Sequence, residues 1–295
     1  MIHIMNHTPF HTGKHLGIGA AAVFVSLASQ NIGASFAKHL FPVVGAAGMT
    51  VLRTAIAAGL LLLIRRPWRS RLEQKHLGAI LRYGAMLGLM NLMIYQAFAR
   101  IPIGIAVAIE VLGPLAVVLF NARRLTDFVW LAAAILGLGL LLPLRADPHA
   151  LDPLGVVFAM GAAITWALYI VFGKRLSAAP EVDAVAWGMV VAAIVASPLG
   201  VWEAGNTLLS PPVLMTGLVI AALSSALPYS LEMFALYRLP AHVFGILVST
   251  APAVAALAGF AVLGERLQAN QWIAICLIMV AVGGSTLSSK SSRSA

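Results

Sequence analysis

The amino-acid sequence predicts an all-α integral membrane protein with ten transmembrane helices arranged as two inverted five-helix repeats. The first observation behind this prediction is composition, because 61% of the 295 residues are hydrophobic and only 10% are Asp, Glu, Lys or Arg. Soluble domains carry about 25% charged residues, and the mean hydropathy of +0.95 excludes both a soluble domain and a disordered chain. The other two observations are a series of long apolar runs and an internal repeat.

The apolar runs number ten, and each approaches the ~20 residues that a helix needs to cross the hydrocarbon core. The first run is longer than the ~7–15-residue apolar core of a signal peptide, so it is expected to remain as a helix. The longest loop, 65–77, is too short to hold a soluble domain. The predicted spans are residues 16–37, 44–64, 78–99, 102–120, 127–144, 153–172, 184–202, 213–235, 241–263 and 270–288.

Basic residues are distributed unevenly over the predicted loops. With the N-terminus inside, 14 Lys and Arg residues fall on the cytoplasmic side and 4 on the outer side, so the positive-inside rule places both termini in the cytoplasm. The net charge of +9 is therefore interpreted as a topology signal, with the headgroups of the lipid bilayer as its partners. No clustered basic surface remains to bind nucleic acid.

The two ends of the chain lie outside the predicted spans. Residues 1–15 and 289–295 are predicted to be cytoplasmic tails, the first of them disordered. Four histidines in the first tail are spaced four residues apart, which on a helix would stack imidazoles as metal ligands; they are His3, His7, His11 and His15. Pro9 and Gly13 interrupt such a helix, so a disordered tail is preferred, and no metal or other cofactor is expected.

The two halves of the chain, 16–144 and 153–288, resemble one another weakly but in register. Residues 97–102 match residues 235–240 at an offset of 138. Each half holds five spans, an odd number, so the second half must be inverted across the membrane. Inverted repeats are typical of secondary transporters, whose substrate site lies near the midplane between the halves. The alternative is an old duplication kept for packing.

Two prolines follow the same offset. Pro114 and Pro252 fall within the fourth and ninth spans. Because proline has no backbone N–H, each is expected to break or bend its helix and to free a backbone carbonyl. Such a bend can line a cavity, or it can serve packing alone.

Two charged residues lie near the middle of predicted spans, where a charge costs ~2.5–3.5 kcal/mol on insertion scales. Arg53 is central in the second span and Glu110 in the fourth, so the two sit at nearly the same depth and either pair directly or face a common cavity. In the functional interpretation Arg53 binds a substrate carboxylate, and Glu110 binds an ammonium group or a coupling proton. The alternative is a permanent structural ion pair. The repeat pairs Glu110 with Val248, so the architecture alone does not require an acid there.

Other charges lie nearer the ends of spans. Glu232, in the eighth span, is a candidate second acidic site for proton coupling or a cytoplasmic gate, and the alternative is a side chain that reaches the interface. Interface anchoring is expected for four residues at span ends, namely Lys38, Asp127, Lys174 and Glu265.

Uncharged polar side chains also gather inside the spans. Hydrogen bonds between helices explain many such residues individually, but as a set they fit a small polar pocket. The predicted pocket residues of this kind are Gln30, Asn91, Tyr95, Trp166, Tyr169 and Tyr229. In the third span, Gly84 and Gly88 permit close helix contact, either within a monomer or between the subunits of a homodimer.

No catalytic signature is present in the sequence. It lacks Gly-x-Ser-x-Gly, His-Glu-x-x-His and a phosphate-binding loop, and it has one cysteine, so an enzyme is not expected. ATP-driven transport requires a soluble nucleotide-binding domain, for which the loops have no room. The energy for transport must therefore come from a proton, ion or substrate gradient.

Several stretches resemble the drug/metabolite transporter superfamily, specifically its EamA-type ten-helix members and, among these, the inner-membrane threonine/homoserine exporter branch. The resemblance covers residues 16–288. It is carried by residues 33–42 continuing to Arg53, and by the stretches 102–110, 113–117, 127–130 and 225–233.

The resemblance implies a multi-pass protein of the bacterial inner membrane that exports small amino acids, chiefly threonine and homoserine, by proton antiport with alternating access. A zwitterionic substrate would then bind between the halves, with its carboxylate at Arg53 and its ammonium group near Glu110, and with protonation of Glu110 or Glu232 coupled to the cycle. The alternative function is efflux of drug-like cations or transport of another small metabolite.

Overall fold

Apolar runs form helices in this chain because a backbone in lipid must satisfy its hydrogen bonds within its own segment. The computed structural model describes residues 13–69, 74–120, 125–141, 151–176, 183–236, 238–239 and 241–291, and these residues form helices and no β-strand. The first half of the chain contains α1 (Gly13–His39), α2 (Phe41–Arg65), the 3₁₀ turn η1 (Pro67–Arg69), α3 (Gln74–Phe98), α4 (Ile103–Glu110), α5 (Leu112–Leu119) and α6 (Leu125–Leu141). The second half contains α7 (Pro153–Leu176), α8 (Ala184–Ala204), the 3₁₀ turn η2 (Gly205–Leu209), α9 (Pro211–Ala221), the π-helical turn η3 (Ala222–Ala226), α10 (Leu227–Leu236), α11 (Ala241–Val248), α12 (Ala251–Leu263) and α13 (Ala269–Ser291).

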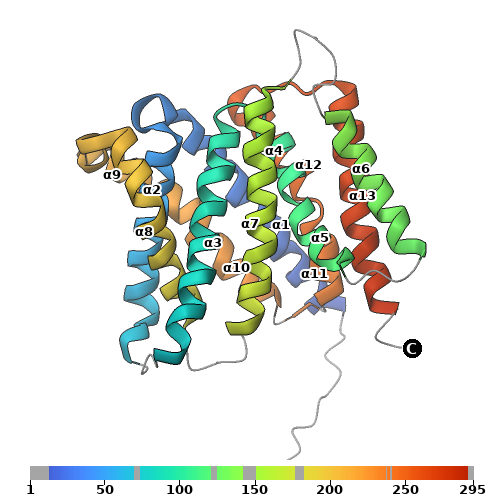
Figure 1. Ribbon diagram of the computed structural model, residues 1–295, viewed down its shortest axis with the longest axis horizontal. Helices are drawn as coiled ribbons and strands as arrows, with labels where there is room; N and C mark the ends of the chain where they lie inside the picture. The colour runs from blue at the N-terminus through green and yellow to red at the C-terminus, as the bar shows by residue number, and fades with distance from the viewer. Residues whose placement is uncertain are drawn as a thin grey trace, which may run out of the picture.

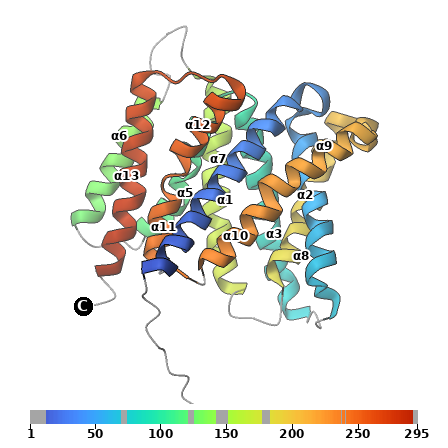
Figure 2. The same cartoon turned by 180° about the vertical axis from the view of Figure 1, so that it is seen from behind.

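The helices stand side by side in one bundle (Figures 1 and 2). Seven helical segments in the described chain are long and apolar enough to cross a membrane, and three shorter apolar segments accompany them, Ile103–Val117, Asp127–Leu141 and Pro211–Ser225. The chain is therefore an all-helical membrane protein. The start of α1 and the end of α13 lie at the same end of the bundle (Figure 1).

The helices at both chain ends reach further than the sequence predicts. Helix α1 begins at Gly13 and α13 continues to Ser291, so both extend by about one turn or less into the segments predicted as tails. Residues 1–12, with three of the four spaced histidines, lie outside the described residues, as does the side chain of His15. The structure therefore says nothing of the predicted metal spacing.

The fourth and ninth predicted spans are each divided into two helices, as the two prolines predict. Helix α4 ends at Glu110 and α5 begins at Leu112, two residues before Pro114. Helix α11 ends at Val248 and α12 begins at Ala251, immediately before Pro252. The breaks follow because each proline removes one backbone donor and its ring crowds the preceding turn.

The eighth predicted span is also interrupted, which the sequence analysis missed. Helix α9 leads into the π-helical turn η3 and then into α10, with Pro228 as the second residue of α10. Pro228 has no N–H to give to the carbonyl of Ser224, four residues earlier. A widened turn at this point accommodates the missing bond.

Four long helices, α2, α3, α7 and α8, pack against one another through small residues. A Cβ added at Gly84 would lie 2.7 Å from the carbonyl oxygen of Gly188, and one at Gly88 would lie 2.8 Å from that of Ala192. The Gly-x-x-x-Gly pattern therefore brings α3 against α8 inside one chain. Helix α2 has a single kink near its start, at Gly45, where φ is 70°.

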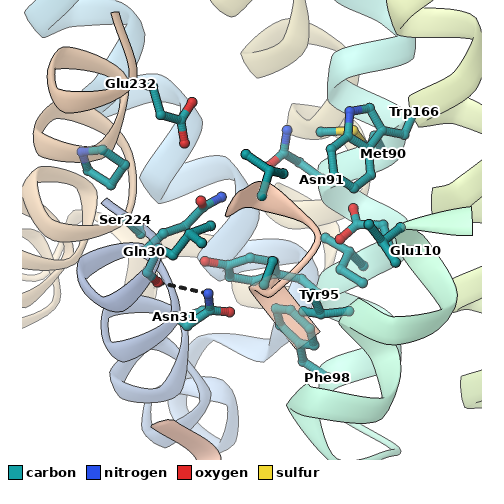
Figure 3. A pocket seen from close by; sticks show the side chains of 18 of the residues that line it. Gln30, Asn31, Met90, Asn91, Tyr95, Phe98, Glu110, Trp166, Ser224 and Glu232 are labelled. Carbon is teal, nitrogen blue, oxygen red and sulfur yellow. Dashed lines mark hydrogen bonds between the residues drawn. The ribbon is translucent and has the colours of Figure 1, made fainter. Parts of the chain in front are cut away.

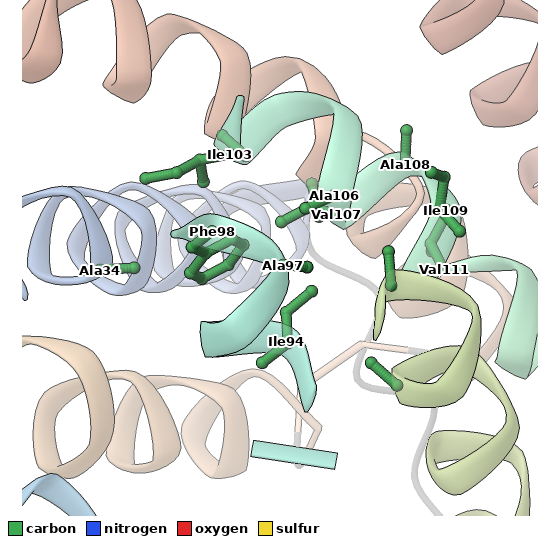
Figure 4. Close-up of a cluster of buried hydrophobic side chains, with 14 of the residues drawn as sticks. Ala34, Ile94, Ala97, Phe98, Ile103, Ala106, Val107, Ala108, Ile109 and Val111 are labelled. Atoms are coloured by element: carbon green, nitrogen blue, oxygen red, sulfur yellow. The ribbon is translucent and has the colours of Figure 1, made fainter. Parts of the chain in front are cut away.

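Buried apolar side chains surround α4. Its residues from Ile103 to Ile109 are all buried, and Figure 4 shows them packed with Ile94, Ala97 and Phe98 of α3 and Ala34 of α1. A helix that is apolar on every side is buried within the protein. The edge of the bundle is different, since α6 and α13 lie side by side there (Figure 1) and Cys276, the only cysteine of the chain, is exposed on α13.

Ion pairs connect helix ends that are far apart in the sequence. Lys38 Nζ at the end of α1 lies 2.7 Å from Glu265 Oε1, after α12, and the Ile103 N–H at the start of α4 donates to Glu265 Oε2 at 2.9 Å. Lys38 and Glu265 thus bind one another rather than only anchoring at an interface as expected. Arg65 and Asp183 join α2 to α8 at 3.4 Å.

Candidate functional site

A cavity of about 260 Å³ lies between helices from both halves of the chain. Helices α1, α2, α3, α4 and α7 line it together with η3, α10, α11 and the first residue of α12, whereas α8 contributes no lining residue. Polar groups from these segments face one another across it (Figure 3). Because the walls come from segments that are distant in sequence, only the folded bundle assembles this site.

Arg53 enters the cavity from the middle of α2 and is only 8% exposed. Its Nη2 donates to Asn91 Oδ1 on α3, and its Nη1 donates to the carbonyl oxygen of Ser224 at 3.5 Å. The guanidinium carbon lies 4.8 Å from the centre of the Tyr95 ring, a cation–π distance. Arg53 Nε has no hydrogen-bond partner, so one buried donor remains unsatisfied.

Tyr95 provides a second buried polar atom without a partner. The residue is 2% exposed, and its hydroxyl makes no hydrogen bond. Its ring is held between Phe41 and Phe98, with ring centres 5.8 Å and 5.5 Å away. Leaving a buried donor unpaired costs roughly 1–3 kcal/mol, and the Tyr95 hydroxyl and Arg53 Nε are two such donors at one cavity.

Glu110 is the last residue of α4 and lines the same cavity as Arg53. No ion pair or hydrogen bond joins its carboxyl group to another residue in the described ranges, Arg53 included. The two mid-membrane charges therefore face a common cavity, and the alternative of a direct structural ion pair is not what the structure adopts.

Glu232 lies on the opposite side of the cavity from Glu110 (Figure 3), on α10. The hydroxyl of Ser26 on α1 lies 3.1 Å from Glu232 Oε1 and 3.2 Å from the carbonyl oxygen of Pro228, and it donates to one of them at a time. Helix α1 thus holds the Glu232 side chain within the bundle. This differs from the alternative, in which the side chain reaches the membrane interface.

The remaining predicted residues also surround this cavity. Asn91 Nδ2 donates to the Leu87 carbonyl at 2.7 Å, which orients its Oδ1 toward Arg53. The Tyr169 hydroxyl accepts a 2.9 Å bond from Tyr83. The structure brings together seven of the eight residues predicted to bind substrate: Gln30, Arg53, Asn91, Tyr95, Glu110, Trp166 and Tyr169. Tyr229 belongs to α10, but its side chain lies outside the described part of the structure.

Sequence reasoning missed two serines at this site. Ser224 offers its carbonyl oxygen to Arg53, and Ser26 bonds Glu232. One available signal for Ser26 was its position four residues before Gln30, on the same face of α1. For Ser224 the signal was Pro228, which deprives its carbonyl of a helical donor.

An all-helical bundle with several membrane-crossing helices and a polar cavity at its centre has the architecture of a membrane transporter. The model of the EamA-like transporter family matches residues 153–287. The threonine/homoserine exporters RhtA of Escherichia coli (strain K12) and Salmonella typhimurium (strain LT2) are each 46% identical over 265 residues, covering 90% of this chain and 90% of their own. The chain therefore belongs to the EamA-like transporters of the drug/metabolite transporter superfamily, in the RhtA branch.

More distant relatives agree with this placement. The uncharacterized transporter YwfM of Bacillus subtilis (strain 168) is 29% identical over 155 residues, which covers 51% of this chain and 52% of YwfM. A protein of known crystal structure superposes with a TM-score of 0.56 at 19% identity, covering 95% of this chain and 99% of the other. That likeness concerns the fold alone. RhtA and YwfM are named as transporters, not as enzymes.

Proposed function

We propose that this protein exports small amino acids of the threonine and homoserine type across the bacterial inner membrane, as a secondary transporter driven by proton antiport. One observation carries the proposal. The unpartnered donors of Arg53 and Tyr95 share one buried cavity with two carboxyl groups, Glu110 and Glu232. A zwitterion offers an anion to the first pair and a cation to the acids, and the names of the RhtA relatives support this substrate class.

In this proposal Arg53 and Tyr95 bind the substrate carboxylate, and Glu110 binds its ammonium group. Gln30, Asn91, Trp166, Tyr169 and Tyr229 complete the pocket. Glu110 and Glu232 exchange the coupling protons, because each carboxyl group gains or loses a charge in surroundings of low polarity. The size of the cavity, about 260 Å³, lies below the ~300–1,000 Å³ typical of pockets for drug-sized ligands, which favours a small metabolite over a drug-like cation.

The architecture proposed for transport is ten spans in two inverted repeats, 16–144 and 153–288, which alternate access to the central site. The seven long helices and three shorter apolar segments supply enough elements for ten spans. The break between α4 and α5 at Val111 and the break between α11 and α12 at Ser249 fall 138 residues apart, the same offset as the prolines. Both tails would face the cytoplasm, which the charge bias supports.

Reconstituted transport tests the proposal. Proteoliposomes with the full-length protein and a pH gradient should accumulate labelled homoserine and threonine against their gradients, and Arg53→Gln should abolish this flux. Arg100→Gln is the matched control, because Arg100 lies beyond the end of α3 beside the exposed side chain of Asp152. Glu110→Gln and Glu232→Gln should each remove the dependence on the pH gradient. Undiminished pH-driven flux in both acid variants would refute proton coupling through these residues.

A further inference from the structure

Three prolines of the interrupted spans lie four residues after a residue that lines the cavity. Pro114 follows Glu110, Pro228 follows Ser224 and Pro252 follows Val248, each by four positions. In a continuous helix the N–H of the later residue bonds the carbonyl of the earlier one, and proline has no N–H. The backbone carbonyls of these three cavity-lining residues, Glu110, Ser224 and Val248, therefore all lack the donor that a continuous helix would supply.

One of these three carbonyls already binds a cation. The carbonyl oxygen of Ser224 accepts a bond from Arg53 Nη1 at 3.5 Å. The carbonyl opposite Pro228 thus accepts a hydrogen bond from a positively charged donor inside the same cavity. No described cationic side chain other than Arg53 lines the cavity, so the carbonyls of Glu110 and Val248 have no equivalent partner.

The two remaining carbonyls lie at the same level of the bundle. Helices α4 and α12 run antiparallel, since Glu265 after α12 accepts the N–H of Ile103 at the start of α4. They touch through Gly104, where an added Cβ would lie 2.6 Å from Ala256 Cα. Glu110 lies six residues after Gly104 along α4, and Thr250 lies six residues before Ala256, next to the start of α12. The breaks after α4 and α11 are therefore neighbours.

Electrostatics at these breaks favour a cation. Helices α4 and α11 both end at the cavity, at Glu110 and Val248, and the last carbonyl oxygens of a helix are acceptors that have no donor within the helix. Side chains serve other carbonyls of the α11 end, since the Ser249 hydroxyl donates to Ile246 O at 2.6 Å. The carboxyl group of Glu110 adds further negative charge at the same place.

We infer that the carbonyl oxygens of Glu110 and Val248, at the ends of α4 and α11, form the binding site for the ammonium group of the substrate together with the Glu110 carboxyl group. Interrupted membrane helices that present carbonyls and C-terminal ends to a ligand are a known plan of transporter sites. This inference rests on the proposed function, and it adds that recognition of the α-amino group belongs largely to the backbone of both halves of the chain. Molecules that keep the carboxylate and hydroxyl but lack the amino group would then bind weakly.

Restoring the missing backbone donor tests this site. In Pro252→Ala the new N–H can bond the carbonyl of Val248, and in Pro114→Ala it can bond that of Glu110. We expect each variant of the full-length protein to bind homoserine about tenfold more weakly, as measured by calorimetry in detergent. Competition by 4-hydroxybutyrate, which is homoserine without its amino group, should be unchanged.

Pro198→Ala is the matched control, because Pro198 lies within α8, is exposed and does not line the cavity. It should leave the affinity for both ligands unchanged. If Pro252→Ala and Pro114→Ala bind homoserine as the parent protein does, or weaken both ligands equally, the carbonyl site is wrong. A parent protein that neither binds nor transports homoserine would instead overturn the proposed function.

Discussion

Two sets of helices differ in the chemical groups that they can present to a ligand. The first set is the four long helices α2, α3, α7 and α8. The second set is the interrupted segments α4–α5, η3–α10 and α11–α12. Of the long helices, α2, α3 and α7 meet the cavity and are unbroken there, so their backbone groups are bonded internally and they contribute only side chains, such as Arg53, Asn91 and Tyr95. The interrupted segments contribute backbone carbonyls as well. The comparison teaches that one set holds the bundle together while the other shapes the site.

Close backbone packing of the long helices gives the largest expected effect. In Gly88→Val the side chain would meet the backbone of Ala192, since a Cβ there lies 2.9 Å from Ala192 Cα. Backbone has little freedom to move away, so we expect the free energy of unfolding in detergent to fall by about 3 kcal/mol. Gly59→Val on α2 is the control, because a Cβ at Gly59 meets nothing within 4 Å. Equal stability of the two variants would contradict the rigid packing of this set.

A smaller effect is expected where α1 is joined to the interrupted segments. Lys38 on α1 bonds Glu265, which also accepts the first N–H of α4. Lys38→Met removes a charged hydrogen bond from a mostly buried pair, and the unfolding free energy should fall by about 2 kcal/mol. In a double-mutant cycle, Glu265→Gln should cost less in the Lys38→Met background than alone. Additive losses would show that the pair is not coupled.

The stability of an interrupted helix should depend on a serine hydroxyl at its end, whereas a continuous helix does not need such a hydroxyl. At the end of α11 the Thr250 N–H bonds Leu247, so the Ile246 carbonyl relies on the hydroxyl of Ser249. Ser249→Ala should therefore lower the unfolding free energy by about 1 kcal/mol.

Ser197 provides the comparison within a long helix. Its hydroxyl bonds the carbonyl of Ala193 at 2.6 Å within α8, where the helix itself supplies a backbone donor. Ser197→Ala should thus leave stability nearly unchanged in the same denaturation series. A loss as large as that of Ser249→Ala would remove the distinction between the two sets.

The smallest effect is expected for a hydroxyl between two long helices. Tyr83 on α3 and Tyr169 on α7 are stacked, with ring centres 4.7 Å apart, and share a 2.9 Å hydrogen bond. Tyr83→Phe removes the hydroxyl but keeps the ring, so we expect a loss of about 0.5 kcal/mol. Homoserine binding should persist in this variant. A loss above that of Ser249→Ala would mean that the hydroxyl, not the ring, joins α3 to α7.

The sequence predicts the membrane class, the interruptions at Pro114 and Pro252 and most of the polar residues that line the cavity, because each depends on local hydropathy, depth or backbone chemistry. The π-helical turn η3 was missed, since hydrophobic periodicity carries no signal for one widened turn. The contacts of Glu232 with Ser26 and of Lys38 with Glu265 span 206 and 227 residues. Such partners are decided by tertiary packing, which apolar runs of similar composition do not specify.

Cys276 has a practical consequence for following the transport cycle. It lies on the same exposed face of α13 as Ile273 and Val280, which are 56% and 57% exposed. Because the chain has one cysteine, Cys276→Ser gives a cysteine-free background, in which single cysteines placed at either end of the cavity are the thiols that react with reagents added from one side of the membrane.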